Sequence, residues 1–286
     1  MTQPTSTPAR VVALLSPGAM GSAVGARLVA RGATVLTSLA GRGAASAERA
    51  GSAGMIDVGD ADLARADLIL SILPPAEAAG LAQRLLPHFA ADGPRPLYID
   101  ANALSPESKR GIADMLAGAG VAMVDGGIVG PPPRDGGREP TIYLSGPDAE
   151  RGRMLADLGL RIAVLDGPVG AAAALKMCYA AMNKGVVALA VGALLAAERA
   201  GAGDALAEEM AASMPDLLAR FRRQVPDMYP KAYRWVAEMH EIAAFLGEDA
   251  GAAAMFDGAA DLFDRIAADM AGDRRDIAAL DRILAR

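Results

Sequence analysis

The stretch LLSPGAMGSAVG, Leu14–Gly25, decides how the rest of the sequence is interpreted. It connects a short apolar run to a segment with apolar residues at helical spacing. Dinucleotide-binding domains carry the pattern G-x-G-x-x-G at such a turn. Here Ser16 stands at the first glycine, whereas Gly18 and Gly21 keep the second and third. The pattern predicts a phosphate-binding turn altered on its strand side; the alternative is an ordinary strand–turn–helix that binds no nucleotide.

The phosphate side of this turn is the start of the predicted helix. The first amides of a helix have no partner within it, and its positive dipole end attracts a diphosphate. We therefore expect cofactor contacts from five residues of the turn: Ser16, Gly18, Ala19, Met20 and Gly21.

The order of segments along the chain predicts an α/β protein. Short apolar runs alternate with helical stretches, as in a doubly wound parallel sheet with right-handed crossovers. After Gly167 only helical patterns follow. We expect a Rossmann domain over residues 1–166 and an all-α domain over 167–286 for substrate and dimer contacts. Strands are predicted at 11–15, 34–39, 68–73, 97–100, 121–125, 141–144 and 161–165, and helices at 19–31, 76–89 and 106–118.

The residues after the second predicted strand favour NADP(H) over NAD(H). In NAD-binding folds an acid about 20 residues after the glycine motif holds the ribose 2′-hydroxyl, whereas a 2′-phosphate needs an arginine nearby. No Asp or Glu precedes Glu48, and the strand end at Ser38 is followed by Arg42. We expect Ser38 and Arg42 to contact NADP(H); the alternative is that Arg42 is a solvated loop side chain.

Composition excludes several classes of protein. The net charge is −6 and no long basic block occurs, so we expect no nucleic-acid partner. The longest uncharged apolar run, Gly185–Ala197, is shorter than the ~20 residues of a membrane span and predicts a buried core helix. The single Cys178 is expected to be a buried thiol, and no signal-peptide pattern occurs. These features predict a cytoplasmic protein with neither a membrane partner nor a metal.

Lys176 is the candidate catalytic residue. It lies in an otherwise apolar helical run, where a buried ammonium is too costly to be casual packing. Tyr179 and Asn183 follow at i+3 and i+7 on the same helix face, and we expect them to contact substrate. Burial, with Lys184 nearby, should lower the pKa of Lys176 and allow proton transfer. The alternative is a lysine that reaches solvent along its stem.

Four stretches together resemble the β-hydroxyacid dehydrogenase family, which is related to 6-phosphogluconate dehydrogenase. They are SPGAMGSAVGARL (16–28), SILPP (71–75), DANALSP (100–106) and GAAAALKMCYAAMNKG (170–185). The resemblance implies a nicotinamide-dependent oxidoreductase in which Lys176 is the general acid or base and Leu73 and Pro74 contact the cofactor. It also implies a homodimer of helical domains, a contact that the small residues after Gly185 would permit.

Two positions depart from the family's pattern. The substrate-contacting asparagine, four residues after the lysine, is Ala180 here. The substrate loop is DGGIVGP, Asp125–Pro131, with Val129 in place of a serine. We expect Gly127 of this loop to contact substrate, while a substrate other than the usual small hydroxyacid stays open.

Other candidate residues have two interpretations each. Asn102 either positions the nicotinamide or substrate, or caps the helix that begins near Ser105. Tyr233, Trp235 and His240 are expected to line a substrate pocket in the helical domain. The alternative is a structural histidine beside an ordinary i,i+4 ion pair of Arg234 with Glu238.

The sequence as a whole predicts an NADP(H)-dependent oxidoreductase that transfers a hydride between nicotinamide and a small carbonyl or hydroxy compound. An imine reductase, which has a similar architecture, is a second hypothesis, favoured by the missing serine and by the loop Gly130–Pro133. A non-catalytic NADP-binding sensor is a third. The polar stripe that begins at Lys176 argues against the sensor, because a sensor needs no buried proton donor.

Overall fold

The computed structural model describes residues 10–15, 17–89, 95–134 and 136–285. The chain divides into two compact units, which we call the Rossmann unit (Met1–Lys176) and the helical unit (Met177–Arg286). The long helix α7, Ala171–Arg199, crosses the division. The predicted fold class is confirmed, because a mostly parallel eight-stranded sheet with helices is followed by a helical region. The boundary at Gly167, where strand patterns end, stays a prediction.

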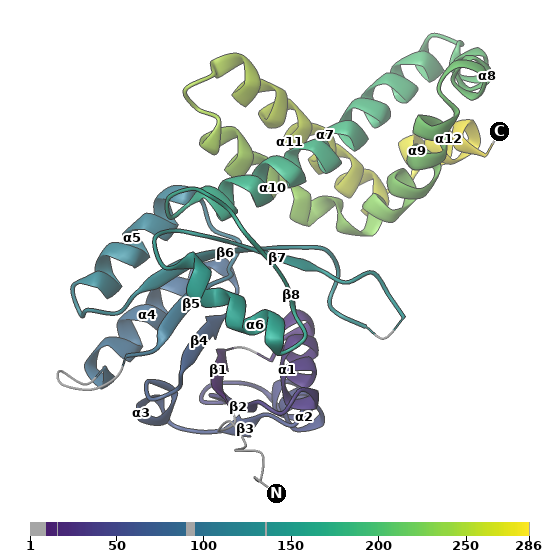
Figure 1. Cartoon of the computed structure of the whole chain (residues 1–286). Coiled ribbons are helices and arrows are strands. Elements are labelled where there is room, and N and C mark those ends of the chain that lie inside the picture. The colour runs from purple at the N-terminus through teal and green to yellow at the C-terminus, as the bar shows by residue number, and fades with distance from the viewer. Residues whose placement is uncertain (1–9, 16, 90–94, 135, 286) are drawn as a thin grey trace, which may run out of the picture. The chain divides into compact units, whose positions relative to one another are not determined.

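The sheet of the Rossmann unit has the strand order β3-β2-β1-β4-β5-β6-β7-β8 (Figure 1). The order therefore reverses between β1 and β4, as in doubly wound nucleotide-binding sheets. All neighbouring strands are parallel except β6 and β7. The strands are β1 Val11–Leu15, β2 Thr34–Thr37, β3 Ile56–Asp57, β4 Leu68–Ser71, β5 Leu97–Asp100, β6 Met123–Val129, β7 Thr141–Ser145 and β8 Arg161–Val164.

Apolar clusters cover both faces of this sheet. Val12 and Leu14 of β1 belong to one cluster, and Ala13 and Leu15 to another, because successive side chains of a strand point to opposite faces. Helices α1 (Ala19–Ala30), α2 (Ala44–Ser52) and α6 (Met154–Asp157) pack on the first face. Helices α3 (Asp60–Leu63), α4 (Ala78–Leu85) and α5 (Pro106–Ala117) pack on the second.

The antiparallel pair β6–β7 differs from the wholly parallel sheet that the sequence predicts. β6 runs on to Val129 and pairs with β7, so the predicted substrate loop Asp125–Pro131 is largely strand. Parallel neighbours need a crossover of a dozen or more residues, usually a helix. The connection here starts with Gly130 and three prolines, which do not continue into a helix, and the chain turns back.

The helical unit is built around one face of α7. Val187, Val191 and Leu194 of α7 are buried in the same core as Phe263 of α11. The other helices are α8 Gly203–Ser213, α9 Pro215–Met228, α10 Ala232–Phe245, α11 Ala250–Ala271 and α12 Arg275–Leu284.

One expectation for α7 is wrong, because Cys178 is exposed rather than buried. The run Gly185–Ala197 is part of a core helix, as predicted, but only one of its faces is buried, and Leu189 is 70% exposed. Helix α7 is long and apolar enough to cross a membrane by length and composition, although core helices of globular proteins pass the same test. Its buried side chains are those of such a core helix.

Gly127 of β6 marks a close approach of α7 to the sheet. A Cβ atom at this position would lie 2.5 Å from the backbone oxygen of Ala172 and 3.5 Å from the Cβ atom of Lys176. The missing side chain is therefore what allows the first turns of α7 to lie against β6. The structure gives Gly127 a packing role; its predicted contact with substrate stays a prediction.

We expect Gly127→Ala to lower the free energy of unfolding by about 1–3 kcal/mol, because the added methyl group meets backbone that cannot rotate away. Chemical denaturation of the purified chain measures the change. Gly111→Ala in α5 is the matched control, since a Cβ atom there meets nothing within 4 Å. It should be neutral or stabilising by about 0.5–1 kcal/mol. Equal effects of the two substitutions would contradict the packing role.

Candidate active site and cofactor-binding edge

The predicted phosphate turn lies at the strand-order reversal, where ligands bind in doubly wound sheets. Gly18 is the N-cap of α1, and no side chain caps this end. A Cβ atom at Gly18 would meet nothing within 4 Å, so the space in front of the helix is open. Ala19, Met20 and Gly21 form the first turn of α1, whose amides lack helical acceptors. Ser16 lies outside the described residues.

Arg49 of α2 is a cation beside this turn that the sequence analysis missed. Its Nε atom donates to the backbone oxygen of Pro17 at 2.7 Å, and a second guanidinium nitrogen donates to Ser46 Oγ at 3.1 Å. No spacing rule connects an arginine in the second helix with the first turn. Arg49 therefore adds positive charge near the site expected for a diphosphate.

Asn102 ties the end of β5 to the end of β4. Its Nδ2 atom donates to Ser71 Oγ at 2.8 Å, and its Oδ1 atom accepts from the backbone amide of Leu73. Asn102 is almost fully buried. Ser105, not Asn102, caps α5, because Ser105 Oγ accepts from the amide of Ser108 at 3.2 Å. The capping alternative is thus wrong, and Asn102 holds the segment that contains Leu73 and Pro74 against the strand ends.

Arg42 is paired with an acid rather than solvated. Its guanidinium forms an ion pair of 2.5 Å with Glu77, which lies in a short 3₁₀ turn, Pro75–Glu77, after β4. The two side chains line a cavity of about 230 Å³ together with Ser38 and Leu73. The acid that is missing after β2 is therefore supplied by Glu77, which follows β4. Sequence spacing did not reveal Glu77, because the residue follows a strand that is not adjacent in sequence.

Lys176 lies beside charged residues on β5, β6 and α5. The pKa of its ammonium is lowered to about 8, first by burial and then by the charge of Lys109, whereas Asp100 and Asp125 act in the opposite direction. The neighbouring cation is thus Lys109 and not Lys184, which the sequence analysis proposed. The ammonium of Lys184 pairs with Glu238 inside the helical unit.

Lys109, Asp100 and Asp125 form a charged network with no exposed side-chain surface. Lys109 Nζ donates to Asp100 Oδ1 at 2.7 Å, to the backbone oxygen of Asp100 and to that of Gly126 at 3.1 Å. It also lies 3.3 Å from Asp125 Oδ1. The sequence does carry one signal for it: Lys109 falls on the buried face of α5 with Ile112 and Leu116. A charged residue on an apolar helix face is uncommon unless it is paired.

The Asp125 carboxylate also anchors the start of α7. Its Oδ2 atom accepts from the amides of Gly170 and Ala173 at 2.9 and 3.0 Å and from Ser145 Oγ at 3.0 Å. Ser145 Oγ in turn accepts from the amide of Ala172 at 2.9 Å. These bonds satisfy amides that have no acceptor within the helix, and an acid at a helix N-terminus is favourable for the helix dipole. They fix the turn of α7 that precedes Lys176.

Over most of its length the chain has the fold of a conserved protein of unknown function, MTH1747, whose structure is described as similar to 3-hydroxyacid dehydrogenases. The two sequences are 29% identical, the match covers 90% of this chain and 99% of that one, and the TM-score is 0.74. The structural relatives of this chain are 3-hydroxyacid dehydrogenase-like proteins. Residues 197–266 match a domain of unknown function (DUF1932). A comparison with curated proteins gives no match.

More distant relatives of this 3-hydroxyacid dehydrogenase-like fold have known activities or ligands. The 3-hydroxyisobutyrate dehydrogenase of Mycobacterium tuberculosis is 20% identical, with 96% of this chain and 99% of that chain covered and a TM-score of 0.69. Psf3 in complex with NADP⁺ is 17% identical, with 89% and 93% covered and a TM-score of 0.58. An imine reductase of Streptomyces aurantiacus is 20% identical, with 97% and 100% covered and a TM-score of 0.53. At these identities the matches show the fold.

The remaining substrate candidates engage partners inside the helical unit. Asn183 Oδ1 accepts from Arg220 at 2.9 Å, and its Nδ2 atom donates to the backbone oxygen of Tyr179 at 3.1 Å. Trp235 packs edge-on against Phe263 with ring centroids 5.2 Å apart. His240 Nδ1 lies 2.9 Å from Asp257 Oδ1, an exposed pair.

The expected i,i+4 partner of Arg234 is engaged elsewhere. Glu238 pairs with Lys184, whose Nζ atom also lies 5.1 Å from the centroid of the Trp235 ring. Arg234 instead lies over the ring of the exposed Tyr233 at 6.0 Å. Substrate contacts by Tyr179, Asn183, Tyr233, Trp235 and His240 stay predictions.

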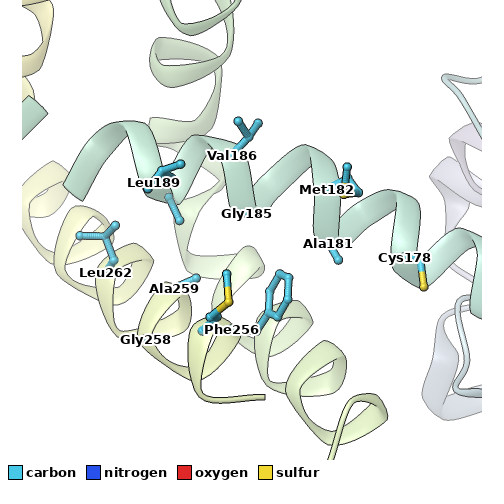
Figure 2. A pocket seen from close by; sticks show the side chains of 12 residues that line it. Cys178, Ala181, Met182, Gly185, Val186, Leu189, Phe256, Gly258, Ala259 and Leu262 are labelled. Atoms are coloured by element: carbon cyan, nitrogen blue, oxygen red, sulfur yellow. The ribbon is translucent and has the colours of Figure 1, made fainter. Parts of the chain in front are cut away.

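An apolar groove of about 670 Å³ lies between α7 and α11 (Figure 2). Met182 and Leu189 of α7 line it together with Met255 and Phe256 of α11, and the exposed Cys178 lies on its wall. Gly185 allows the close approach of the two helices, because a Cβ atom there would be 3.3 Å from the Phe256 ring. The groove therefore presents apolar side chains at the surface of the helical unit.

We expect Lys176 to release its proton near pH 8, because burial disfavours its charged form. Reductive methylation with ¹³C-formaldehyde followed by NMR titration measures this, and the sequence has only three other lysines, Lys109, Lys184 and Lys231. The variant Lys176→Arg identifies the signal by removing it. Titration of that signal at the ordinary lysine value would contradict the site geometry.

Proposed function

We propose that this chain is an NADP(H)-dependent oxidoreductase that transfers a hydride between nicotinamide and a small carbonyl or hydroxy compound. The observation that carries the proposal is the ammonium of Lys176, which lies beside two buried carboxylates, Asp100 at the carboxyl end of β5 and Asp125 of β6, in a 3-hydroxyacid dehydrogenase-like fold. Among the relatives are dehydrogenases and an NADP⁺ complex, which support the same class of activity.

The residues of the Rossmann unit fit a nicotinamide cofactor. Gly18 leaves open space in front of the N-terminus of α1, where a diphosphate finds unpaired amides. Asn102 holds Leu73 and Pro74 on the other side of the strand-order reversal. The bound cofactor supplies or accepts the hydride, and the chain supplies binding, orientation and the proton.

Lys176 is the group that moves the proton. For carbonyl reduction its ammonium donates to the oxygen that becomes a hydroxyl, and for alcohol oxidation its neutral amine accepts that proton. A pKa of about 8 keeps both forms accessible near neutral pH. Reduction should therefore slow as the pH rises through about 8, whereas oxidation should accelerate over the same interval.

Arg42 supports the choice of NADP(H), whereas the carboxylate of its partner Glu77 opposes it. A 2′-phosphate would take the place of the Glu77 carboxylate at the guanidinium, and arginine binds phosphate through two parallel hydrogen bonds. The same carboxylate can accept a hydrogen bond from the 2′-hydroxyl of NAD(H). Glu77 is thus the residue that works against NADP(H) preference.

An imine reductase is the second candidate function. Val129 lies in β6 at the position where the resembled family has a substrate-binding serine, which weakens the case for a small hydroxyacid. An imine reductase shares the fold. A substrate panel of cyclic imines, aldehydes and small hydroxyacids at saturating NADP(H) separates the two candidates. Failure of all of them would favour the non-catalytic sensor.

We further propose that the protein is a cytoplasmic homodimer. The groove between α7 and α11 supports this part, because its apolar side chains at positions 182, 189 and 255 are each largely exposed in a single chain.

Lys176→Met is expected to reduce turnover by about 10²–10⁴-fold, the usual contribution of general acid–base catalysis, while NADPH still binds. Steady-state kinetics in both directions and a fluorescence titration of NADPH measure the two quantities. Lys231→Met, at an exposed lysine that pairs with Asp227, is the matched control. Undiminished turnover in Lys176→Met would remove Lys176 from the mechanism.

Arg42→Ala should weaken NADPH binding roughly tenfold and leave NADH binding nearly unchanged, because only NADPH carries the 2′-phosphate. Glu77→Gln should strengthen NADPH binding, since the phosphate no longer displaces a carboxylate. Dissociation constants of both cofactors test this, with Arg65→Ala at an exposed ion pair as the control. A parallel loss of NADPH and NADH affinity in Arg42→Ala would contradict the assignment.

Leu189→Glu is expected to shift the dimer toward monomer at micromolar concentration, because the substitution places a charge in the apolar groove. Sedimentation equilibrium measures the association. Ile56→Glu adds the same charge at an exposed apolar residue of β3 and should leave association unchanged. A monomeric wild-type chain would overturn the homodimer proposal.

A further inference from the structure

The buried network contains one lysine that the proposed chemistry does not use. Lys109 Nζ has its hydrogens directed to the Asp100 carboxylate and to two backbone oxygens, at Asp100 and Gly126. Its side chain has no exposed surface. An ammonium that is saturated with acceptors and sealed from solvent cannot hand a proton to a substrate, so its effect must pass through its neighbours.

Those neighbours are two carboxylates with unused acceptor capacity. Asp100 Oδ2 and Asp125 Oδ1 are buried without a hydrogen-bond partner among the described residues. Lys109 balances them by its ion pairs, at 2.7 Å to Asp100 and 3.3 Å to Asp125. Without this cation, the two buried carboxylates would remain beside Lys176 and favour its charged form.

We propose that Lys109 is a positioning residue that occupies the carboxylates of Asp100 and Asp125 and so leaves the Lys176 ammonium free to exchange its proton. The inference rests on the proposed proton-transfer role of Lys176. It also assigns a second effect to Lys109: through Asp125, which anchors the amides of Gly170 and Ala173, Lys109 supports the turn of α7 from which Lys176 projects.

The charges that face Lys176 lie on three elements, α5, β5 and β6. Lys109 of α5 disfavours the protonated form of Lys176, whereas Asp100 of β5 and Asp125 of β6 favour it. Removal of the cation leaves two carboxylates to hold the proton of Lys176. Removal of one carboxylate leaves Lys109 with a single carboxylate, so the pKa of Lys176 falls and its proton is released more easily.

The experiment compares Lys109→Met, Asp100→Asn and the double variant in the full chain. Two readouts are followed: the pH–rate inflection in each direction, and the NMR titration of ¹³C-methylated Lys176. Lys109→Met should raise the titration of Lys176 by about 1–3 pH units, and Asp100→Asn should lower it. The double variant restores the net charge of the network and should return the titration toward the wild-type value.

A merely structural Lys109 gives a different result. It would lower activity and stability in Lys109→Met while the titration of Lys176 stays at the wild-type pH, and that result overturns the proposal. If Lys109→Met fails to fold, Asp100→Asn provides the test, because in that variant Lys109 still pairs with Asp125 and with its backbone acceptors. An unchanged titration of Lys176 in Asp100→Asn would also overturn the proposal.

The NMR titration requires no turnover, so it separates this inference from the proposed function. If Lys176→Met keeps full activity but the Lys176 signal moves as expected in the network variants, the electrostatic coupling stands and the proton-transfer role of Lys176 falls. If the signal does not move but Lys176→Met is inactive, the proton-transfer role of Lys176 stands and the proposed role of Lys109 falls. Lys231→Met provides the unperturbed reference for both readouts.

Discussion

The Asp125 carboxylate joins more parts of the Rossmann unit than any other side chain described above. One oxygen accepts from the first amides of α7 and from a serine of β7, and the other faces the ammonium of Lys109 on α5. A strand, its antiparallel neighbour and two helices therefore meet at a single charged group. Such a group is costly in the interior unless it is paired, because an unpaired buried charge costs several kcal/mol.

This arrangement connects the fold to the chemistry. The first turn of α7 is held by Asp125, the strand beneath it has no side chain at Gly127, and Lys176 follows one turn later. Its burial and its charged neighbours are consequences of how α7 is seated on the sheet. Burial lowers the pKa of Lys176 most, and the charges of the residues that hold the helix act on it as well.

The sequence predicts much of the unit because its signals are local. The altered glycine turn, the buried strands and the lysine in an apolar helix can all be recognised within short windows. Glu77, Arg49 and Lys109 are different, because each acts on a residue far along the chain that the topology brings near. Ser105 caps α5 and Asn102 does not, because the side-chain amide of Asn102 is bonded to Ser71. Only the three-dimensional structure shows that bond.

The pair of β6 and β7 shows a further limit. Apolar runs indicate strands but not their direction, and here a proline-rich connection reverses the chain where a helix would have kept it parallel. Helix α7 carries a weaker signal still, because its apolar residues show little helical periodicity. The exposure of Leu189 and Cys178 is therefore visible only in the folded unit.

The network of Lys109, Asp100 and Asp125 also restricts how this sequence can change over evolutionary time. Replacing one partner of a buried ion pair costs about 3–5 kcal/mol, a large share of the roughly 5–15 kcal/mol by which a domain is stable. Each single step away from the present set therefore removes a large part of that stability. The three positions are expected to change together over evolutionary time rather than one at a time.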